Sequence, residues 1–236
     1  MPGVLSAFEG IDWRPLWLSL QIASLSTALT VIAGTGFALL LAWRRLPARH
    51  LIDSLISAPL VLPPTVLGYY LLVLLGRNSA IGAAWQRVFG EPIVFNFAGA
   101  VIAASVGSLP LVVRSIRLGI ESVEPNLVAA ARTLGARPVR VIATIVLPLA
   151  APGVIAGAML GFARALGDYG MTQMLASSKF NGLFGVNNQS PASIFVYDEL
   201  VAQRDSSARN MALATTVLGI TMLFFANRLT RRLHRG

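Results

Sequence analysis

The chain has 236 residues, of which 55% are hydrophobic and only 12% are charged. This composition excludes an ordinary soluble domain, in which about a quarter of the residues are charged. Cysteine is absent, so a disulfide framework and a thiolate metal site are excluded as well. The formal net charge of +9 could indicate a surface that binds nucleic acid, and its distribution along the chain decides whether it does.

Five runs of the sequence carry no Asp, Glu, Lys or Arg, and each is close to or above the roughly 18–20 residues that a membrane-crossing helix needs. Around them we predict five transmembrane helices, at residues 16–43, 52–76, 97–117, 145–168 and 209–229. A sixth charge-free run, 180–197, is rich in Asn, Gln, Gly and Pro, whose polar groups a span would bury without water. The expected fold class is an all-α integral membrane protein with one transmembrane domain over residues 1–236.

The positive charge falls on one side of this arrangement. With five spans and the N-terminus outside, the inner segments hold twelve arginines and three acids, which accounts for the whole net charge. This asymmetry is typical of the positive-inside rule, so we expect the C-terminus in the cytoplasm, membrane lipid as a partner, and no nucleic acid. The first apolar segment is too long for a signal-peptide core and should remain as a helix.

The second predicted span, residues 52–76, contains three prolines, Pro59, Pro63 and Pro64. They remove backbone donors and force a break or a kink in the helix. Irregular backbone survives in a membrane only where protein or a water-filled cavity surrounds it. This segment, with Thr65 directly after the last proline, is therefore either a packed kink or part of a pathway lining.

The connection that follows, residues 76–96, contains Ile81, Trp85 and Val88 at helical spacing, which predicts a short interfacial helix. The third span then begins near Phe97. Its small polar side chains include Ser105 and Ser108.

Between the third and fourth spans the sequence predicts a short surface helix over residues 125–135. Glu124 and Pro125 suit its beginning, because proline fits the first helical position and an acid complements the helix dipole. Gly135 fits a left-handed stop, and Pro138 prevents the helix from resuming. One face carries Leu127, Ala130 or Ala131, and Leu134. The segment is therefore either a compact rod for a groove on another protein or an ordinary amphipathic surface helix.

Two ionisable residues, Arg164 and Asp168, lie four positions apart near the end of the fourth span. Neighbours at this helical spacing can pair, and ionisable groups in a span have to be paired or face a cavity. Either Arg164 faces a pathway, where it attracts an anion or orders a gate, or the two residues form a purely structural pair.

The segment Ala129-Ala130-Ala131-Arg132-Thr133-Leu134-Gly135, followed at fixed spacing by Ile145 and Leu147-Pro148, resembles the signature loop of ABC-importer permeases. That pattern is Glu-Ala-Ala, three residues, Gly, nine residues, Ile, one residue and Leu-Pro, so Ala129 takes the place of the usual glutamate. Residues 61–72, 75–78, 131–135 and 162–170 together are similar to the permease subunits of molybdate transporters. Those subunits commonly have Glu-Phe at the positions of Asp168-Tyr169.

The resemblance implies a type I ABC-importer permease fold with five transmembrane helices and a cytoplasmic coupling helix. It implies transport of molybdate across the inner membrane by two permease copies, two ABC ATPase subunits and an external oxyanion-binding protein. The residues expected to couple to the ATPase are Glu124, Ala129, Ala130, Ala131, Arg132, Leu134 and Gly135. The pathway or gate candidates are Thr65, Ser105, Ser108, Arg164 and Asp168.

The chain is not expected to be an enzyme or to hold a cofactor or metal. Its only lysine, Lys179, is followed by Phe180, so the Gly-x-x-x-x-Gly-Lys-Ser/Thr loop that binds ATP phosphates is missing. An intramembrane enzyme would need a nucleophile–base or metal cluster in the spans, which contain neither His nor Cys. A sulfate or tungstate permease is the alternative within the class, and a passive anion channel is a remote one.

Overall fold

The computed structural model describes residues 12–42, 48–176, 179–183 and 188–233, except for the side chains of 225–227 and 229–233. Trp43, at the end of the first predicted span, lies outside these residues. The helices are α2 (Arg14–Ala42), α3 (Arg49–Val61), α4 (Pro64–Leu75), α5 (Ala80–Phe89), α6 (Phe97–Glu121), α7 (Pro125–Thr133), α8 (Pro138–Val141), a π-helical turn η2 (Ile142–Val146), α9 (Leu147–Leu149), α10 (Ala151–Leu166), α11 (Gly170–Ala176), α12 (Ala192–Val201) and α13 (Asp205–Leu233).

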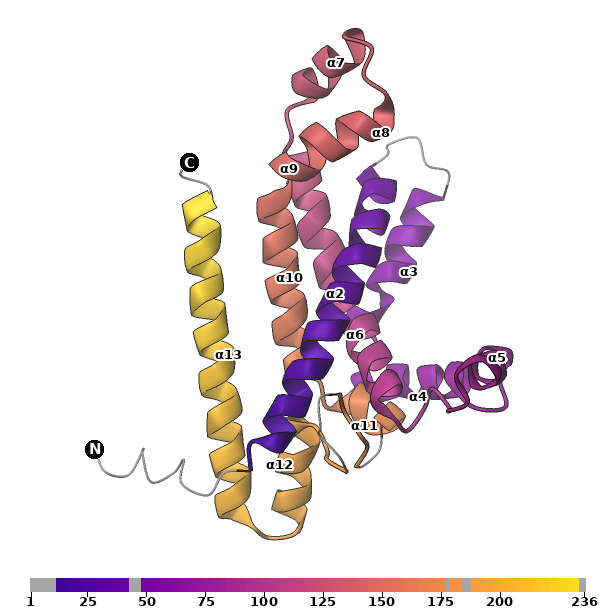
Figure 1. Ribbon diagram of the computed structural model, residues 1–236, viewed down its shortest axis with the longest axis vertical. Helices are drawn as coiled ribbons and strands as arrows, with labels where there is room; N and C mark the ends of the chain where they lie inside the picture. The colour runs from indigo at the N-terminus through magenta and orange to yellow at the C-terminus, as the bar shows by residue number, and fades with distance from the viewer. Residues whose placement is uncertain (1–11, 43–47, 177–178, 184–187, 234–236) are drawn as a thin grey trace, which may run out of the picture.

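Helices α2, α6 and α10 form the central bundle, with α13 on one side and α3 on the other (Figure 1). The bundle has two ends, which we name by the short helices that mark them. At the α7 end, the core is built around Leu41, Val112 and Ile116. At the α11 end, it is built around Leu18, Ile22 and Leu166. Apolar side chains fill the bundle at both ends, as the expected all-α fold requires.

The tightest contact in the bundle joins α6 to α10. A Cβ atom added to Gly153 would lie 2.8 Å from the Cα atom of Gly119 and 2.9 Å from the carbonyl oxygen of Ser115. The Ser115 hydroxyl donates a 3.0 Å hydrogen bond to the carbonyl oxygen of Gly153. Glycines at such a crossing let two backbones touch, as they do in membrane helix pairs, and this contact holds α6 and α10 together.

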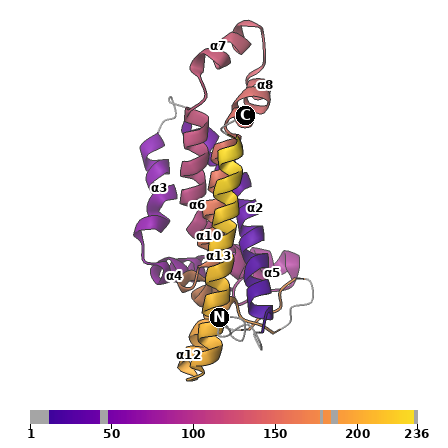
Figure 2. The ribbon, with the colours of Figure 1, turned by 90° about the vertical axis from the view of Figure 1, so that its left-hand side faces the viewer.

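The prolines of the second predicted span break it, as the sequence predicts. Helix α3 ends at Val61 and α4 begins at Pro64, and the two helices are bent by 117° relative to each other. Pro63 precedes the new helix with an extended backbone. Helix α4 therefore turns across the α11 end of the bundle and does not continue α3 (Figure 2).

The fourth predicted span is also bent. The segment Pro138–Leu149 meets α10 at 67°. Within it, the N–H of Leu147 donates to the carbonyl oxygen of Ile142, five residues back. Pro148 has no N–H with which to continue the ordinary α-helical pattern, and the wider π turn accommodates its ring.

In the described part of the chain, α2 and α6 are long and apolar enough to cross a membrane, and the two bent pairs bring the number to four if each is one span. The fifth predicted span, 209–229, coincides with α13, part of which lies outside the described side chains. By length and composition these helices suit a multi-pass membrane chain, and the number of five spans remains a prediction.

Candidate functional site

The short helix α7 projects from its end of the bundle (Figure 1). It covers Pro125–Thr133, within the predicted range, and none of its residues is fully buried. Pro125 stands at its first position, as predicted. Glu124 precedes the helix, and its side chain does not cap the backbone N–H groups. Its carboxylate accepts a 3.2 Å hydrogen bond from the side-chain amide of Asn126.

The end of α7 is fixed by Gly135. Its φ of +79° lies in the left-handed region that favours glycine. The Gly135 N–H donates to the carbonyl oxygen of Arg132 at 3.0 Å, and the Ala136 N–H donates to that of Ala131 at 3.1 Å. This pair of hydrogen bonds is the Schellman motif. The predicted left-handed stop is confirmed.

Helix α7 has one face toward the bundle and one face open. Val128 and Ala131 are partly buried against the core at this end. Ala129, Ala130 and Arg132 are exposed. Leu134, just after the helix, is 87% exposed. Together these exposed side chains make up the open face of α7.

The second group of candidates lies at the α11 end, where α10 gives way to α11. Arg164 donates a 3.0 Å hydrogen bond to Asp168 in the predicted i, i+4 ion pair. The side chain of Asp168 is only 2% exposed. Its second oxygen accepts the backbone N–H of Thr172 at 3.0 Å and the Thr172 hydroxyl at 2.7 Å. Asp168 thus pairs with α10 and also satisfies a donor in the first turn of α11.

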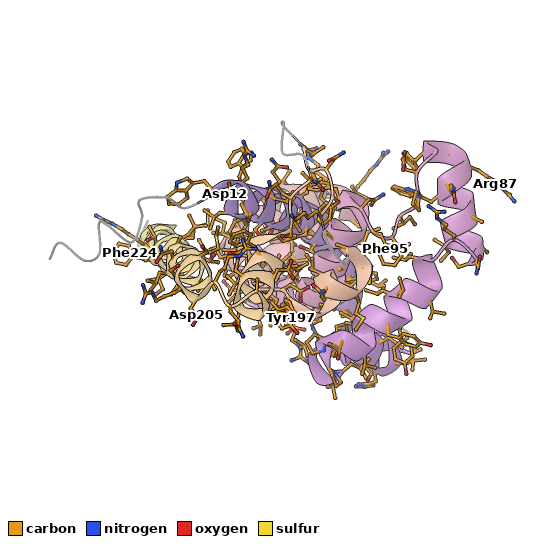
Figure 3. All side chains as sticks on the ribbon, turned by 90° about the horizontal axis from the view of Figure 1, so that it is seen from below. Asp12, Arg87, Phe95, Tyr197, Asp205 and Phe224 are labelled. Atoms are coloured by element: carbon orange, nitrogen blue, oxygen red, sulfur yellow. The ribbon has the colours of Figure 1, made fainter. Side chains whose placement is uncertain are left out.

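Helix α12 is tied to the same junction. The Ser193 hydroxyl donates to the carbonyl oxygen of Asp168 at 2.8 Å. The rings of Tyr169 and Tyr197 pack with centroids 5.3 Å apart, and Tyr197 lies on this face of the molecule (Figure 3). Burial, and next the neighbouring Tyr197 and Asp198, raise the pKa of Tyr169, so its hydroxyl stays neutral at physiological pH. These contacts favour the structural interpretation of the Arg164–Asp168 pair.

Helix α11 wedges between α4 and α6. Met171 is buried against Gly107 of α6, and Arg164 passes the same glycine. Gly68 of α4 faces Met171 and Met174. This arrangement joins the broken second span to the end of α10, and sequence patterns alone did not reveal it, because α11 is too short to show a period.

The three hydroxyl candidates occupy different settings. Thr65 is exposed at the start of α4, beside Gly170 of α11. Ser105 is partly buried and donates to the carbonyl oxygen of Val101 at 2.7 Å. Ser108 has no exposed surface and donates to the carbonyl oxygen of Ala104 at 2.8 Å. Thr65 lies close to the Arg164–Asp168 junction, and Ser108 faces the interior of the bundle.

This architecture, a bundle of apolar helices with a projecting helix between two of its spans, defines a membrane transport subunit. The chain belongs to the family of binding-protein-dependent transport system inner membrane components, whose model matches residues 34–236. The molybdenum transport system permease protein ModB of Escherichia coli (strain K12) is 40% identical over 212 residues, covering 90% of this chain and 91% of that protein. ModB of Haemophilus influenzae is 38% identical over 218 residues, covering 92% and 93%.

A more distant relative is the probable sulfate transport system permease protein cysT of Marchantia polymorpha, 31% identical over 211 residues that cover 87% of this chain and 70% of that protein. Among solved structures, a chain of the MetNI methionine ABC transporter in inward-facing conformations matches with a TM-score of 0.70 at 17% identity, covering 93% of this chain and 94% of that one. A bacterial alginate ABC transporter matches with a TM-score of 0.69 at 13% identity, covering 97% and 82%. These structures share the fold of this chain, which confirms the expected all-α, ABC-importer permease-like architecture but does not test the number of five transmembrane helices.

Proposed function

We propose that this chain is the membrane subunit of an ATP-driven importer that carries molybdate across the inner membrane. In this proposal two copies of the chain work with two ABC ATPase subunits and an external oxyanion-binding protein. The observation that carries the proposal is α7, a projecting helix with an exposed apolar face at the place of the family's signature loop. The names of the two ModB relatives support molybdate as the cargo.

The contacts of α7 supply a route for coupling. Movement of α7 by an ATPase would reach the core through Val128 and Ala131, which touch it. It would also reach α10 through α8, η2 and α9, which connect the two helices in the chain. Since α6 and α10 touch through Gly119 and Gly153, the two helices would rock together. At the other end of the bundle, α10 leads into α11, which packs on α4. The α7 end and the α11 end would therefore open and close alternately.

The charge distribution supports an orientation with α7 in the cytoplasm, the C-terminus on the same side and the N-terminus outside. The chain has no cysteine, so single cysteines can report the topology. In intact cells, a membrane-impermeant maleimide should label Val88→Cys on α5 and should leave Leu134→Cys unlabelled until the cells are opened. The reverse pattern would overturn this orientation.

The candidate residues enter the proposal by their placement. The exposed Ala129, Ala130, Arg132 and Leu134 would contact the ATPase, and Ala129, without the usual carboxylate, would offer only van der Waals contact. Thr65 and Ser105 remain candidates for the pathway, where weak contacts suit an ion that must also leave. Ser108 would support helix packing.

The decisive experiment is ATP hydrolysis by the permease reconstituted in lipid with its cognate ATPase. The binding protein would be added after loading with molybdate, tungstate or sulfate. Stimulation by the molybdate- or tungstate-loaded protein alone would support the proposed importer and narrow its cargo. Stimulation only with sulfate would keep the importer and overturn the cargo. Anion flux without ATP or binding protein would instead indicate a passive channel.

A further inference from the structure

Helix α3 is held to α6 by a ladder of polar side chains, which we call the polar ladder. Its members on α3 recur every four residues, and each faces a polar residue of α6. They are Arg49, Asp53 and Ser57 on α3, and Arg114, Arg117 and Glu121 on α6. No residue of α3 is fully buried; Ile52 and Ile56 are partly buried against the core, and the ladder adds polar contacts to this attachment.

The two rungs nearest the end of α6 are closed ion pairs. Arg117 lies 2.9 Å from Glu121 and 3.1 Å from Asp53. Arg49 lies 3.5 Å from Glu121. Each carboxylate in these rungs has a cationic partner, and both arginines have an anionic one.

The third rung is different, because it carries a positive charge with a neutral partner. Arg114 donates a 3.0 Å hydrogen bond to the hydroxyl oxygen of Ser57. Among the described residues, no carboxylate lies within ion-pair distance of Arg114. Position 57 lies one helical turn beyond Asp53, on the same face of α3. The third rung therefore has a serine where the second rung has a carboxylate.

This rung has the chemistry of a partial anion site. A guanidinium has five N–H donors, and only one of those of Arg114 is given to Ser57. The Ser57 oxygen accepts that bond, so its own O–H is left to donate. A guanidinium and a hydroxyl side by side offer several donors to the oxygen atoms of one tetrahedral oxyanion, and the contact with the guanidinium would be charge-assisted.

The surroundings leave this site open in the single chain. Arg114 is exposed. Leu118, one turn further along α6, is 68% exposed, and Val61, one turn beyond Ser57 on α3, is 84% exposed. Arg114 also lies seven residues before the end of α6 at Glu121, about 10 Å along the helix axis. It lies three residues before the end of the third predicted span at residue 117, and a cation within a span is costly unless it has a partner or faces water.

We infer that Arg114 and Ser57 form a contact for a tetrahedral oxyanion in the half of the transport pathway nearer α7. This inference rests on the proposed function, because the imported anion is its expected occupant. A single net positive charge with two kinds of donor binds such an anion weakly, which suits a station that the ion leaves as well as enters. The closed rungs keep α3 beside α6, and the open rung contacts the cargo.

The test measures molybdate uptake and ATP hydrolysis together, in vesicles that contain the permease, its ATPase and the loaded binding protein. Arg114→Gln should lower the number of ions imported per ATP by about tenfold, the size expected for losing one hydrogen bond to a charged group. Arg114→Lys keeps the charge and should lose less. Arg87→Gln is the matched control, because Arg87 is an exposed arginine on α5, away from the bundle (Figure 3).

Ser57→Asp separates an anion contact from a structural role. The new carboxylate would close the third rung, so the melting temperature of the complex should stay the same or rise, while ions imported per ATP should fall as in Arg114→Gln. Ser57→Asp or Arg114→Gln complexes that import at the wild-type ratio would overturn the inference and leave the proposed importer intact. A wild-type complex that imports none of molybdate, tungstate or sulfate would overturn both.

A lipid phosphate offers the same chemistry as the imported anion. Vesicles of digalactosyl diacylglycerol, which contain no phosphate, distinguish the two sources. If the Arg114→Gln defect persists in these vesicles, the occupant is the transported oxyanion. If the defect disappears there, Arg114 binds a lipid headgroup and the inference is wrong.

Discussion

Helix α6 has two neighbours that it holds in opposite ways. Against α10, the backbones touch at Gly119 and Gly153, so a single added methyl group has no room. Against α3, the contact combines the polar ladder with the partly buried Ile52 and Ile56, and α3 buries none of its residues completely. Close packing fixes a geometry, because protein interiors do not deform continuously, whereas exposed ion pairs are individually weak. From this comparison we expect α6 and α10 to move as one unit and α3 to be attached to it less tightly.

The largest effect is expected at the tight contact. Gly153→Val places a branched side chain against Gly119 and should cost about 3 kcal/mol of stability, in the upper range for overpacking. The readout is the thermal inactivation of the purified complex in detergent. Gly36→Val, on α2, is the control, because a Cβ there meets no atom within 4 Å. Equal inactivation of the two variants would contradict the rigid α6–α10 unit.

The next effect tests whether that unit extends to α11. Asp168→Asn removes the charge that pairs with Arg164 and weakens the bonds from Thr172. We expect a loss of about 2 kcal/mol, since Asp168 is buried and a charged partner is left behind. Hydrogen exchange of α11 should be faster in this variant than in the wild type, while that of α7 should not change. Unchanged protection of α11 would show that Asp168 does not join it to α10.

A smaller stability effect, with a large functional one, is expected at the stop of α7. Gly135→Val forces a β-branched residue to a φ of +79°, at a cost of about 1–2 kcal/mol. The displaced α7 should leave ATP hydrolysis uncoupled from uptake. Gly90→Val is a close control, because Gly90 ends α5 with a φ of +78° and an added Cβ there also meets open space. If Gly135→Val imports as many ions per ATP as the wild type, the proposed coupling role of α7 is contradicted.

The smallest effect is expected on the polar side of α6. Asp53→Asn removes one carboxylate from Arg117, which retains Glu121. Asp53 is partly exposed, so the loss should be about 0.5 kcal/mol, visible as a small shift in melting temperature that disappears at high salt. A loss as large as that of Gly153→Val would remove the distinction between the two contacts.

The sequence predicted best what depends on local chemistry. Proline and glycine define both ends of α7 wherever the rest of the chain lies, and the prediction of residues 125–135 differs from the observed helix only in its last turn. The short helix expected around Trp85 is α5, and its interfacial position remains a prediction. The break at Pro63 was predicted, but the direction of α4 was not, because it depends on contacts with α11 that are distant in sequence.

The setting of each site candidate depends on contacts between helices that are distant in sequence. Whether Ser108 faces a pathway or the bundle depends on where α2 and α10 pack, which the residues of α6 do not specify alone. The polar ladder has a signal in the sequence, the recurrence of Arg49, Asp53 and Ser57 at every fourth position across the beginning of the second predicted span, residues 52–76. That spacing marks one face of a helix, and a polar face inside a membrane needs a partner.

The π turn at Ile142–Val146 affects the direction in which the chain runs between α7 and α10. An extra residue in one turn of a helix rotates everything beyond it by about 100° and shifts it by about 1.5 Å. The π turn therefore helps to determine the path of α8, while the short link to α6 and the contacts of Val128 and Ala131 with the core also position α7. A deletion of a single residue within 142–146 should change the direction of α8 relative to α10 and strain the contacts that hold α7 against the core.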